Sequence, residues 1–327
     1  MLKKIFSIFI CALVTAGSSA VAADSEALKK ILPENSFCGI FPAEVKTIAV
    51  ISPASLPDTK AAMEAVAMLK AANLKVKIYP HALAPAGAGG KFAYPVAQRA
   101  EDFYAAWNDP KNDLILCTRG GSGTYKLVEY LNWSRLKPRK ELRFMGFSDI
   151  TSLHCALNRR NMGHLLAGPS LRTLPGLNPQ ILPQMKRILN GENIKPIKLQ
   201  PLKSGDCSGM PLAGLLSRLL KAHQSGEIPS SKDRIIFIEN IGGNPAKVKE
   251  QLEQLRDSKF FDDASGVVFC HFTRCGKRSV INAVLADFAA SLDIPVYRGY
   301  PFGHHPRNLV IDFNRKAVIS KNQITFE

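Results

Sequence analysis

Short apolar runs alternate with amphipathic helical patterns along the first half of the chain. Residues 47–51 and 114–117 are unbroken apolar or β-branched runs, which indicate strands buried on both faces, and residues 74–78 alternate as a third strand. Between these strands, residues 58–70 and 98–107 carry apolar side chains at helical spacing. Strands that alternate with helices predict a parallel sheet covered on both faces.

The second half of the chain is richer in strand patterns. The expected strands span residues 234–238, 266–271, 309–313, 317–320 and 323–326, with helices beginning at Asn244-Pro245 and over 280–291. Between them and the first half, many Pro, Asn and Gly residues surround one short basic helix. We therefore expect an α/β protein with an N-terminal parallel-sheet domain over 44–170, a linker over 171–205 and a β-rich C-terminal domain over 206–327.

The N-terminus has the pattern of a secretory signal peptide. Two lysines at positions 3 and 4 precede an apolar run of about ten residues, and Ala20-Val21-Ala22 matches an A-x-A cleavage site. A helix that spans a bilayer needs roughly 20 apolar residues, so a retained anchor is the weaker interpretation. We expect removal of residues 1–22 and export to the periplasm of a protein with no integral membrane segment.

The charge balance is strongly basic. The two lysines at positions 3 and 4 are the only charged residues before Asp24, so cleavage lowers the formal charge from +16 to +14. The positive charge is spread along the chain without a dense aromatic-basic module, which argues against a nucleic-acid partner. An anionic cell wall or outer membrane is the favoured neighbour, because a basic surface concentrates anions.

Six cysteines follow the expected cleavage site, too widely spaced for a small disulfide scaffold. Cys270, His271 and Cys275 are the closest approach to a metal-binding pattern, but they lack the paired CxxC spacing of a zinc site. We expect a structural or disulfide role for them. No metal and no organic cofactor is implied by the sequence.

A glycine-rich segment, Arg-Gly-Gly-Ser-Gly at 119–123, directly follows the strand at 114–117. Glycines at a strand-to-helix junction let the backbone approach a ligand and point its N–H groups at negative charge. The segment is neither a Walker loop nor a complete dinucleotide fingerprint. An oxyanion or anion site and a plain tight turn both remain open.

A second sharp junction places Ser148 between an apolar strand and a helix. Nucleophile elbows expose a serine in this way, although Ile150 stands where the G-x-S-x-G pattern has its last glycine. Ser148 could instead cap the helix, with Asp149 favouring the helix dipole. The local sequence alone favours this simpler interpretation.

A carboxylate and an imidazole follow in the second half of the chain. Glu239 comes at the end of the apolar strand at 234–238, and His304 lies in a Gly- and Pro-rich loop. Each alone is more often an ion-pair residue or a solvated side chain. Together with Ser148 they supply a nucleophile, a base and an orienting carboxylate in the order Ser, Glu, His.

The chain resembles the LD-carboxypeptidase family, which includes murein tetrapeptide carboxypeptidases and microcin-immunity peptidases. Five segments carry the resemblance in order and spacing: Arg119-Gly120-Gly121, Gly146-Phe147-Ser148-Asp149-Ile150-Thr151, Gly168-Pro169, Ile238-Glu239-Asn240-Ile241 and Phe302-Gly303-His304. The resemblance extends from about Thr47 to Asp312. It implies an α/β N-terminal domain that carries the serine and a β-rich C-terminal domain that carries Glu and His.

The resemblance also implies roles for individual residues. Ser148 is then the nucleophile, His304 the general acid and base, and Glu239 the residue that orients the imidazole. The backbone N–H groups of Gly121 and Asp149 match the family's oxyanion hole. Such preorganised donors are each worth about 3–4 kcal/mol in the barrier.

Two departures from the family pattern concern the substrate. Ser122 stands where an aromatic residue is common, and Gly214-Leu215 replaces a Gly-Asn pair. A carboxypeptidase must also bind a free carboxylate, for which Arg119 and Arg307 are the candidates.

The resemblance implies hydrolysis of the L,D-peptide bond that releases D-alanine from peptidoglycan stem tetrapeptides. The alternatives are an immunity-type amidase acting on peptide-nucleotide or other acyl-amino-acid conjugates, and a non-catalytic wall-binding protein. Peptidoglycan stem peptides or muropeptides are the expected partners. The sequence leaves a homodimer open.

Overall fold

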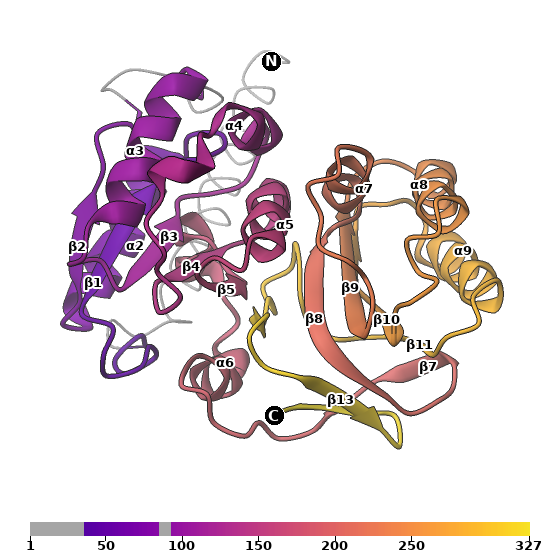
Figure 1. The fold of residues 1–327 in the computed structure, drawn as a ribbon. Helices are drawn as coiled ribbons and strands as arrows, with labels where there is room; N and C mark the ends of the chain where they lie inside the picture. The colour runs from indigo at the N-terminus through magenta and orange to yellow at the C-terminus, as the bar shows by residue number, and fades with distance from the viewer. Residues whose placement is uncertain (1–35, 85–92) are drawn as a thin grey trace, which may run out of the picture.

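The computed structural model describes residues 36–84 and 93–327, so the expected signal peptide at 1–22 lies outside the described residues. Figure 1 shows two lobes, the first mostly from the indigo and magenta half of the chain and the second mostly from the orange and yellow half. Within the described ranges, every helix is too short or too polar to cross a bilayer.

The first lobe is built on a six-stranded sheet in the order β12-β5-β4-β3-β1-β2. Its strands are β1 (Thr47–Ile51), β2 (Lys75–Ile78), β3 (Leu114–Cys117), β4 (Arg143–Gly146), β5 (His164–Ala167) and β12 (Ile311–Asp312). β1 to β5 are mutually parallel, and only β12 is antiparallel to its neighbour. The predicted parallel sheet is confirmed.

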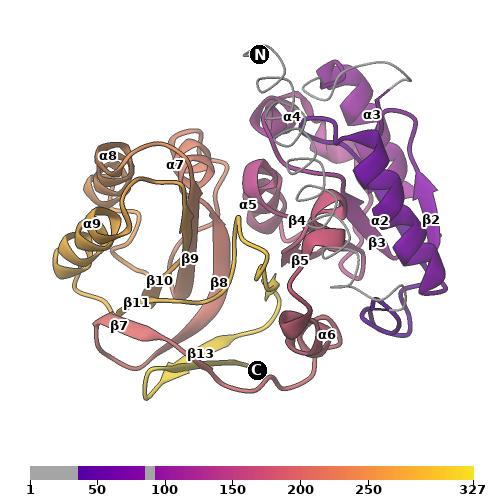
Figure 2. The same ribbon diagram turned by 180° about the vertical axis from the view of Figure 1, so that it is seen from behind.

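Helices cover both faces of this sheet, as the continuous burial of its central strands requires. They are α2 (Thr59–Ala71), α3 (Val96–Asn108), α4 (Thr124–Tyr130) and α5 (Thr151–Arg159). α2 connects β1 to β2, whereas the other three connect strands that advance in the opposite direction across the sheet. Since such crossovers are right-handed, α2 lies on one face and the other three on the opposite face (Figures 1 and 2). Asp58 caps α2 by accepting a hydrogen bond from the Ala61 N–H.

The direction of chain progression reverses between β1 and β3, which are neighbours in the sheet. At such a switch point the loops after the two strands diverge, and a crevice opens at their carboxyl ends. The glycine-rich segment at 119–123 follows β3 and therefore lies at this crevice. The fold thus places the glycine-rich segment at a position suited to a ligand.

The second lobe contains an eight-stranded mixed sheet in the order β6-β14-β13-β8-β9-β10-β11-β7. Its strands are β6 (Ile197–Lys198), β7 (Gln200–Lys203), β8 (Cys207–Leu215), β9 (Arg234–Ile241), β10 (Gly266–Thr273), β11 (Val296–Arg298), β13 (Ala317–Ser320) and β14 (Gln323–Phe326). Three helices, α7 (Leu216–Gln224), α8 (Pro245–Asp257) and α9 (Arg278–Ala290), lie side by side next to it (Figure 1). The predicted β-rich C-terminal domain is confirmed.

Three parts of the chain differ from expectation. The segment predicted to be a linker, 171–205, contains α6 (Leu182–Leu189) and ends in two short strands, β6 and β7. These two strands form the opposite edges of the second sheet. The strand expected at 309–313 is reduced to β12, which joins the first sheet instead of the second. The pattern of 206–224 gave no prediction, yet it forms β8 and α7. The edge strands β6 and β7, and β12 in the first sheet, are stabilised by strands far away in the sequence. Local periodicity does not reveal such partners.

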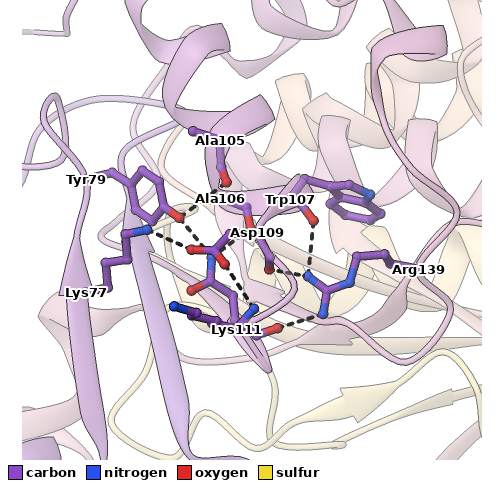
Figure 3. Close-up of polar contacts among 9 residues, drawn as sticks. Lys77, Tyr79, Ala105, Ala106, Trp107, Asp109, Lys111 and Arg139 are labelled. Atoms are coloured by element: carbon purple, nitrogen blue, oxygen red, sulfur yellow. Dashed lines mark hydrogen bonds and ion pairs between the residues drawn. The ribbon is translucent and has the colours of Figure 1, made fainter.

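Part of the basic charge has a structural use, as Figure 3 shows at the carboxyl end of α3. The Arg139 guanidinium donates to the carbonyl oxygens of Trp107, Asp109 and Asn112 at 3.2, 2.6 and 2.8 Å. Cations favour the carbonyl end of a helix, where acceptors lack helical partners. The Lys77 ammonium lies 2.7 Å from the Asp109 carboxylate and lowers its pKa. These cations secure the connection from α3 to β3.

Candidate active site

A cavity of about 630 Å³ lies where the two lobes meet. The residues that line it are Arg119, Gly120, Gly121, Phe147, Ser148, Ser170, Arg172, Thr173, Gly176, Leu177, Ile241, Thr273, Arg274, Gly303, His304, His305, Pro306 and Asn308. They come from the loops after β3, β4 and β5 of the first lobe, from the last residues of β9 and β10, and from the loops after β10 and β11 of the second lobe. Its volume is typical of a small-molecule site.

Ser148 occupies a strained turn between β4 and α5. Its φ of 65° is in the left-handed region, which a residue with a Cβ rarely adopts without a functional reason. The turn depends on two glycines. A Cβ on Gly120 would lie 2.8 Å from the Ser148 Cβ, and one on Gly146 would lie 3.0 Å from the Ile150 Cγ2. Ile150 therefore packs where the G-x-S-x-G pattern places its last glycine, and the sharp turn is still made.

The glycine-rich loop is held close to this turn. Gly121 has a φ of 116°, and an added Cβ would overlap the Ser55 hydroxyl in the loop after β1. The buried Arg99 guanidinium donates to the carbonyl oxygens of Pro53 at 2.6 Å and Gly123 at 3.1 Å. The loops on either side of the switch point are thus joined by one cation.

The Asp149 side chain links the turn to both lobes. Its carboxylate accepts from the Thr124 N–H at 2.9 Å and the Thr124 hydroxyl at 2.8 Å, which fixes the start of α4. Arg218 on α7 approaches the same carboxylate at 3.0 Å. Burial raises the pKa of Asp149, while Thr124 and the charge of Arg218 oppose the shift. The Asp149 carboxylate thus connects the Ser148 turn to the second lobe.

The two lobes also approach closely beside this ion pair. α5 packs against α7 (Figure 1), and the Leu215 N–H donates to the Thr151 hydroxyl at 3.0 Å. Gly214 has no space for a Cβ, which would overlap the Thr151 side chain. The Gly214-Leu215 pair, one of the two departures from the family pattern, therefore serves contact between the lobes and is not among the residues that line the cavity.

Glu239 and His304 form a hydrogen-bonded pair at the other wall of the cavity. The Glu239 Oε2 lies 2.8 Å from the His304 Nδ1, and the Glu239 side chain is fully buried. Because an ionised carboxylate can only accept, this contact favours the tautomer with a proton on Nδ1 and a free lone pair on Nε2. An imidazole in this state can accept a proton from a substrate or a hydroxyl group.

The loop that carries His304 is fixed by its own contacts. Gly303 has a φ of 115°, and a Cβ there would lie 2.8 Å from the Glu239 Cβ. The Gly303 N–H donates to Asn308 Oδ1 at 2.9 Å, and the Thr273 hydroxyl donates to the His304 carbonyl at 2.7 Å. These contacts limit the position of the imidazole.

Ser148 and His304 face the same cavity from opposite lobes. The ring of Phe147, the residue before the serine, lies 4.9 Å from the imidazole between ring centres. Among the described residues, no hydrogen bond joins the Ser148 hydroxyl to His304. Catalytic hydrogen bonds are often long in unliganded enzymes and shorten in the substrate complex. The arrangement suits a nucleophile and a base that engage when a substrate fills the cavity.

Of the three predicted substrate-binding residues, only Arg119 lines the cavity. Ser122 is exposed beside it, where its N–H donates to the Ser55 hydroxyl. Arg307 is exposed, and its guanidinium donates to Gln180 at 2.8 Å. Arg172 and Arg274 do line the cavity and were missed, because isolated arginines in irregular segments carry no signal in the sequence.

Cys270, His271 and Cys275, weighed above as possible metal ligands, make contacts of other kinds. His271 stacks on His305 with ring centres 4.4 Å apart and contacts the Arg307 carbonyl oxygen through Nε2 at 3.0 Å. Burial raises the pKa of both thiols. Across the part of the chain that the structure describes, no three His, Cys, Asp or Glu side chains are grouped to hold a metal ion.

Comparison with protein-family models identifies two domains. The LD-carboxypeptidase N-terminal domain matches residues 48–167, and the LD-carboxypeptidase C-terminal domain matches residues 208–319. Together they cover the Ser148 turn, Glu239 and His304.

Curated relatives are similar over most of the chain. The probable murein peptide carboxypeptidase of Bacillus subtilis is 28% identical over 85% of this chain and 90% of its own length. The murein tetrapeptide carboxypeptidase of Pseudomonas aeruginosa is 26% identical over 70% of this chain and 79% of its own.

Solved structures share the fold at lower identity. The muramoyltetrapeptide carboxypeptidase from Oxalobacter formigenes is 22% identical and superposes with a TM-score of 0.72, covering 86% of this chain and 98% of that chain. The microcin C7 self immunity protein MccF is 20% identical, with a TM-score of 0.75 and coverage of 88% and 97%.

Proposed function

Because the chain belongs to the LD-carboxypeptidase family, we propose that it is a serine peptidase that hydrolyses L,D-peptide bonds of peptidoglycan stem tetrapeptides and releases their terminal D-alanine. The proposal is carried by the 2.8 Å contact between Glu239 and His304 at a cavity that Ser148 also lines. The relatives named as murein peptide carboxypeptidases support the substrate class.

The first chemical step forms a tetrahedral intermediate. The Ser148 Oγ attacks the carbonyl carbon of the L-residue, and His304 Nε2 takes the hydroxyl proton. Glu239 stabilises the imidazolium that results, because its carboxylate accepts the Nδ1 hydrogen bond. The Gly121 and Asp149 N–H groups bind the oxyanion. The close approach of Gly120 to Ser148 and to the Asp149 nitrogen supports this assignment.

The second half of the reaction reverses these roles. His304 gives its proton to the nitrogen of the D-residue, the carbon–nitrogen bond breaks and D-alanine leaves. Water then attacks the ester carbonyl of the resulting acyl-enzyme while His304 accepts a proton from it. The carbon–oxygen bond to Ser148 breaks, His304 returns this proton to the Ser148 Oγ, and the shortened peptide leaves with a new carboxyl group. In this mechanism His304 mediates each proton transfer of the reaction.

The proposed place of action is the periplasm. The predicted signal peptide at 1–22 supports export, and the basic composition suits an anionic wall. There the enzyme meets stem peptides of the wall or fragments newly released from it.

Incubation of the mature protein with stem tetrapeptide tests the proposal by the release of D-alanine. We expect Ser148→Ala to lower kcat by about 10⁴-fold or more. Ser204→Ala, at an exposed serine outside the cavity, is the matched control and should retain activity. Near-normal turnover by Ser148→Ala would exclude the mechanism. Hydrolysis of an acyl-amino-acid nucleotide in place of the tetrapeptide would identify the amidase alternative.

A further inference from the structure

The cavity wall carries positive charge without compensating carboxylates. Its lining includes the three arginines Arg119, Arg172 and Arg274, and no Asp or Glu is among the described residues that line it. Glu239 lies behind His304, fully buried and bonded to it. A substrate that enters this cavity therefore meets cations and neutral donors, which bind anions.

Two of the arginines are held together on the first lobe. The Arg172 N–H donates to the Thr118 carbonyl oxygen at 3.0 Å, which brings the segment after β5 beside Arg119 at the end of β3. Arg119 is oriented by a 3.2 Å hydrogen bond from its guanidinium to the Leu56 carbonyl oxygen. Burial and the nearby charge of Arg172 both lower the pKa of Arg119. Two like charges that share a wall destabilise each other unless an anion binds between them.

A buried hydroxyl adjoins this arginine pair. Ser170 lies two residues before Arg172, lines the same cavity and is 1% exposed. Its Oγ has no hydrogen-bond partner among the described residues. Buried hydroxyl groups nearly always have a partner, so this one is available to a ligand.

Arg274 reaches the cavity from the second lobe. It is exposed and has a φ of 54°, a left-handed conformation that glycine or asparagine would adopt more easily. Its guanidinium has no ion-pair partner in the described residues. The preceding residue, Thr273, donates its hydroxyl hydrogen bond to the His304 carbonyl, which places Arg274 on the histidine side of the cavity. Arg274 therefore offers the cavity a cation that no carboxylate of the described residues neutralises.

We propose that the cavity binds two carboxylates of one substrate, with Arg274 holding the carboxylate of the released D-residue and the Arg119–Arg172 pair holding a carboxylate of the acyl part. This inference rests on the proposed function. His304 must protonate the leaving nitrogen, so the D-residue lies on the histidine side. Its carboxylate is attached to the carbon next to that nitrogen and therefore falls within reach of the same wall as Arg274.

The acyl part of a stem peptide also carries at least one free carboxylate, that of the γ-linked glutamate. The Arg119–Arg172 pair binds this second group, with the Ser170 hydroxyl as an additional donor. The enzyme thereby prefers stems with a free acyl-side carboxylate over stems in which that group is an amide. The geometry assigns two separate specificity determinants to residues on different lobes.

Three peptides and two variants test the assignment through kcat/KM. The peptides are a stem tetrapeptide with free carboxylates, the same peptide amidated on the acyl side, and the same peptide with a C-terminal amide. We expect wild type to prefer the free peptide over each amide by about tenfold to hundredfold, the range of hydrogen bonds to charged groups. Arg172→Gln should abolish only the preference against the acyl-side amide, and Arg274→Gln only that against the C-terminal amide. The control variant is Arg278→Gln, because Arg278 is an exposed arginine on α9.

The outcomes separate this inference from the function on which it rests. If wild type hydrolyses the free and acyl-side amidated stems equally, the two-carboxylate assignment is wrong while D-alanine release stands. If wild type releases D-alanine from none of the peptides, the proposed function itself fails. Equal losses on all three peptides in either arginine variant would also overturn the assignment, and thermal unfolding of each variant distinguishes such losses from misfolding. Arg172→Lys retains the charge without the bidentate fork and should fall between wild type and Arg172→Gln.

Discussion

Replacement of Glu239 by glutamine isolates the contribution of one charge to turnover. The side chain is fully buried, its Oε2 lies 2.8 Å from His304 Nδ1, and its other oxygen has no hydrogen-bond partner among the described residues. Glutamine has the same size, so Glu239→Gln should fold. Its amide can donate to Nδ1, which would shift the ring proton to Nε2 and remove the lone pair that accepts the serine proton.

The expected loss follows from two effects. The imidazolium formed in each step loses a charge-assisted hydrogen bond, and the favoured tautomer becomes the inactive one. In the general Ser-His-Asp mechanism the equivalent change lowers kcat by about 10⁴-fold, so we expect a decrease of roughly 10³ to 10⁴, or about 4–5.5 kcal/mol in the barrier. KM should change by less than about threefold, because Glu239 is behind His304 and does not line the cavity.

Release of D-alanine from the tetrapeptide under saturating conditions measures the effect. Asp312→Asn is a matched control, since Asp312 is also a buried acid, 2.9 Å from His164 Nε2, but lies outside the cavity. It should lower stability and leave kcat near that of wild type. A folded Glu239→Gln enzyme with kcat within tenfold of wild type would refute the orienting role, as would an equal loss in Asp312→Asn.

Three further predictions concern the backbone, the contact between the lobes and the response to pH. Gly303→Ala should lower kcat at least tenfold, because the new Cβ would lie 2.8 Å from the Glu239 Cβ at a φ of 115°; wild-type turnover would contradict the tight fit. Asp149→Ala should lower the free energy of unfolding by about 1.5–3 kcal/mol, since Arg218 loses a carboxylate at 3.0 Å; urea denaturation measures this, and a change below 0.5 kcal/mol would count against it. Burial lowers the pKa of His154 to about 4, so between pH 6.5 and 4 the unfolded chain takes up a proton that the folded protein does not, and stability falls with falling pH. The decrease in the free energy of unfolding from pH 7 to pH 4 should be about 3 kcal/mol smaller in His154→Leu than in wild type. If the two proteins lose stability in parallel as the pH falls, His154 is not responsible.

The sequence alone identified the features that depend on neighbours in the chain. Apolar runs and helical spacing located the central strands β1 and β3, and the caps at Asp58 and Asn244 placed the starts of α2 and α8 because a cap bonds the first turn of its own helix. The junction at Ser148 was equally local, since a strand, a turn and a helix follow one another there. The five family segments gave the division into two domains and the candidate triad.

The tertiary structure decided which of these pieces meet. Glu239 and His304 are 65 positions apart, and their contact depends on the lack of a Cβ at Gly303. Of the two arginines predicted to bind the substrate carboxylate, Arg119 lines the cavity and Arg307 contacts Gln180, whereas the unpredicted Arg274 also lines the cavity. The strand predicted at 309–313 paired with the first sheet, because strand pairing is a choice among distant partners. Local periodicity determines whether a segment becomes a strand or a helix, but the order of strands in a sheet, and hence the residues that share a cavity, depends on packing across the whole chain.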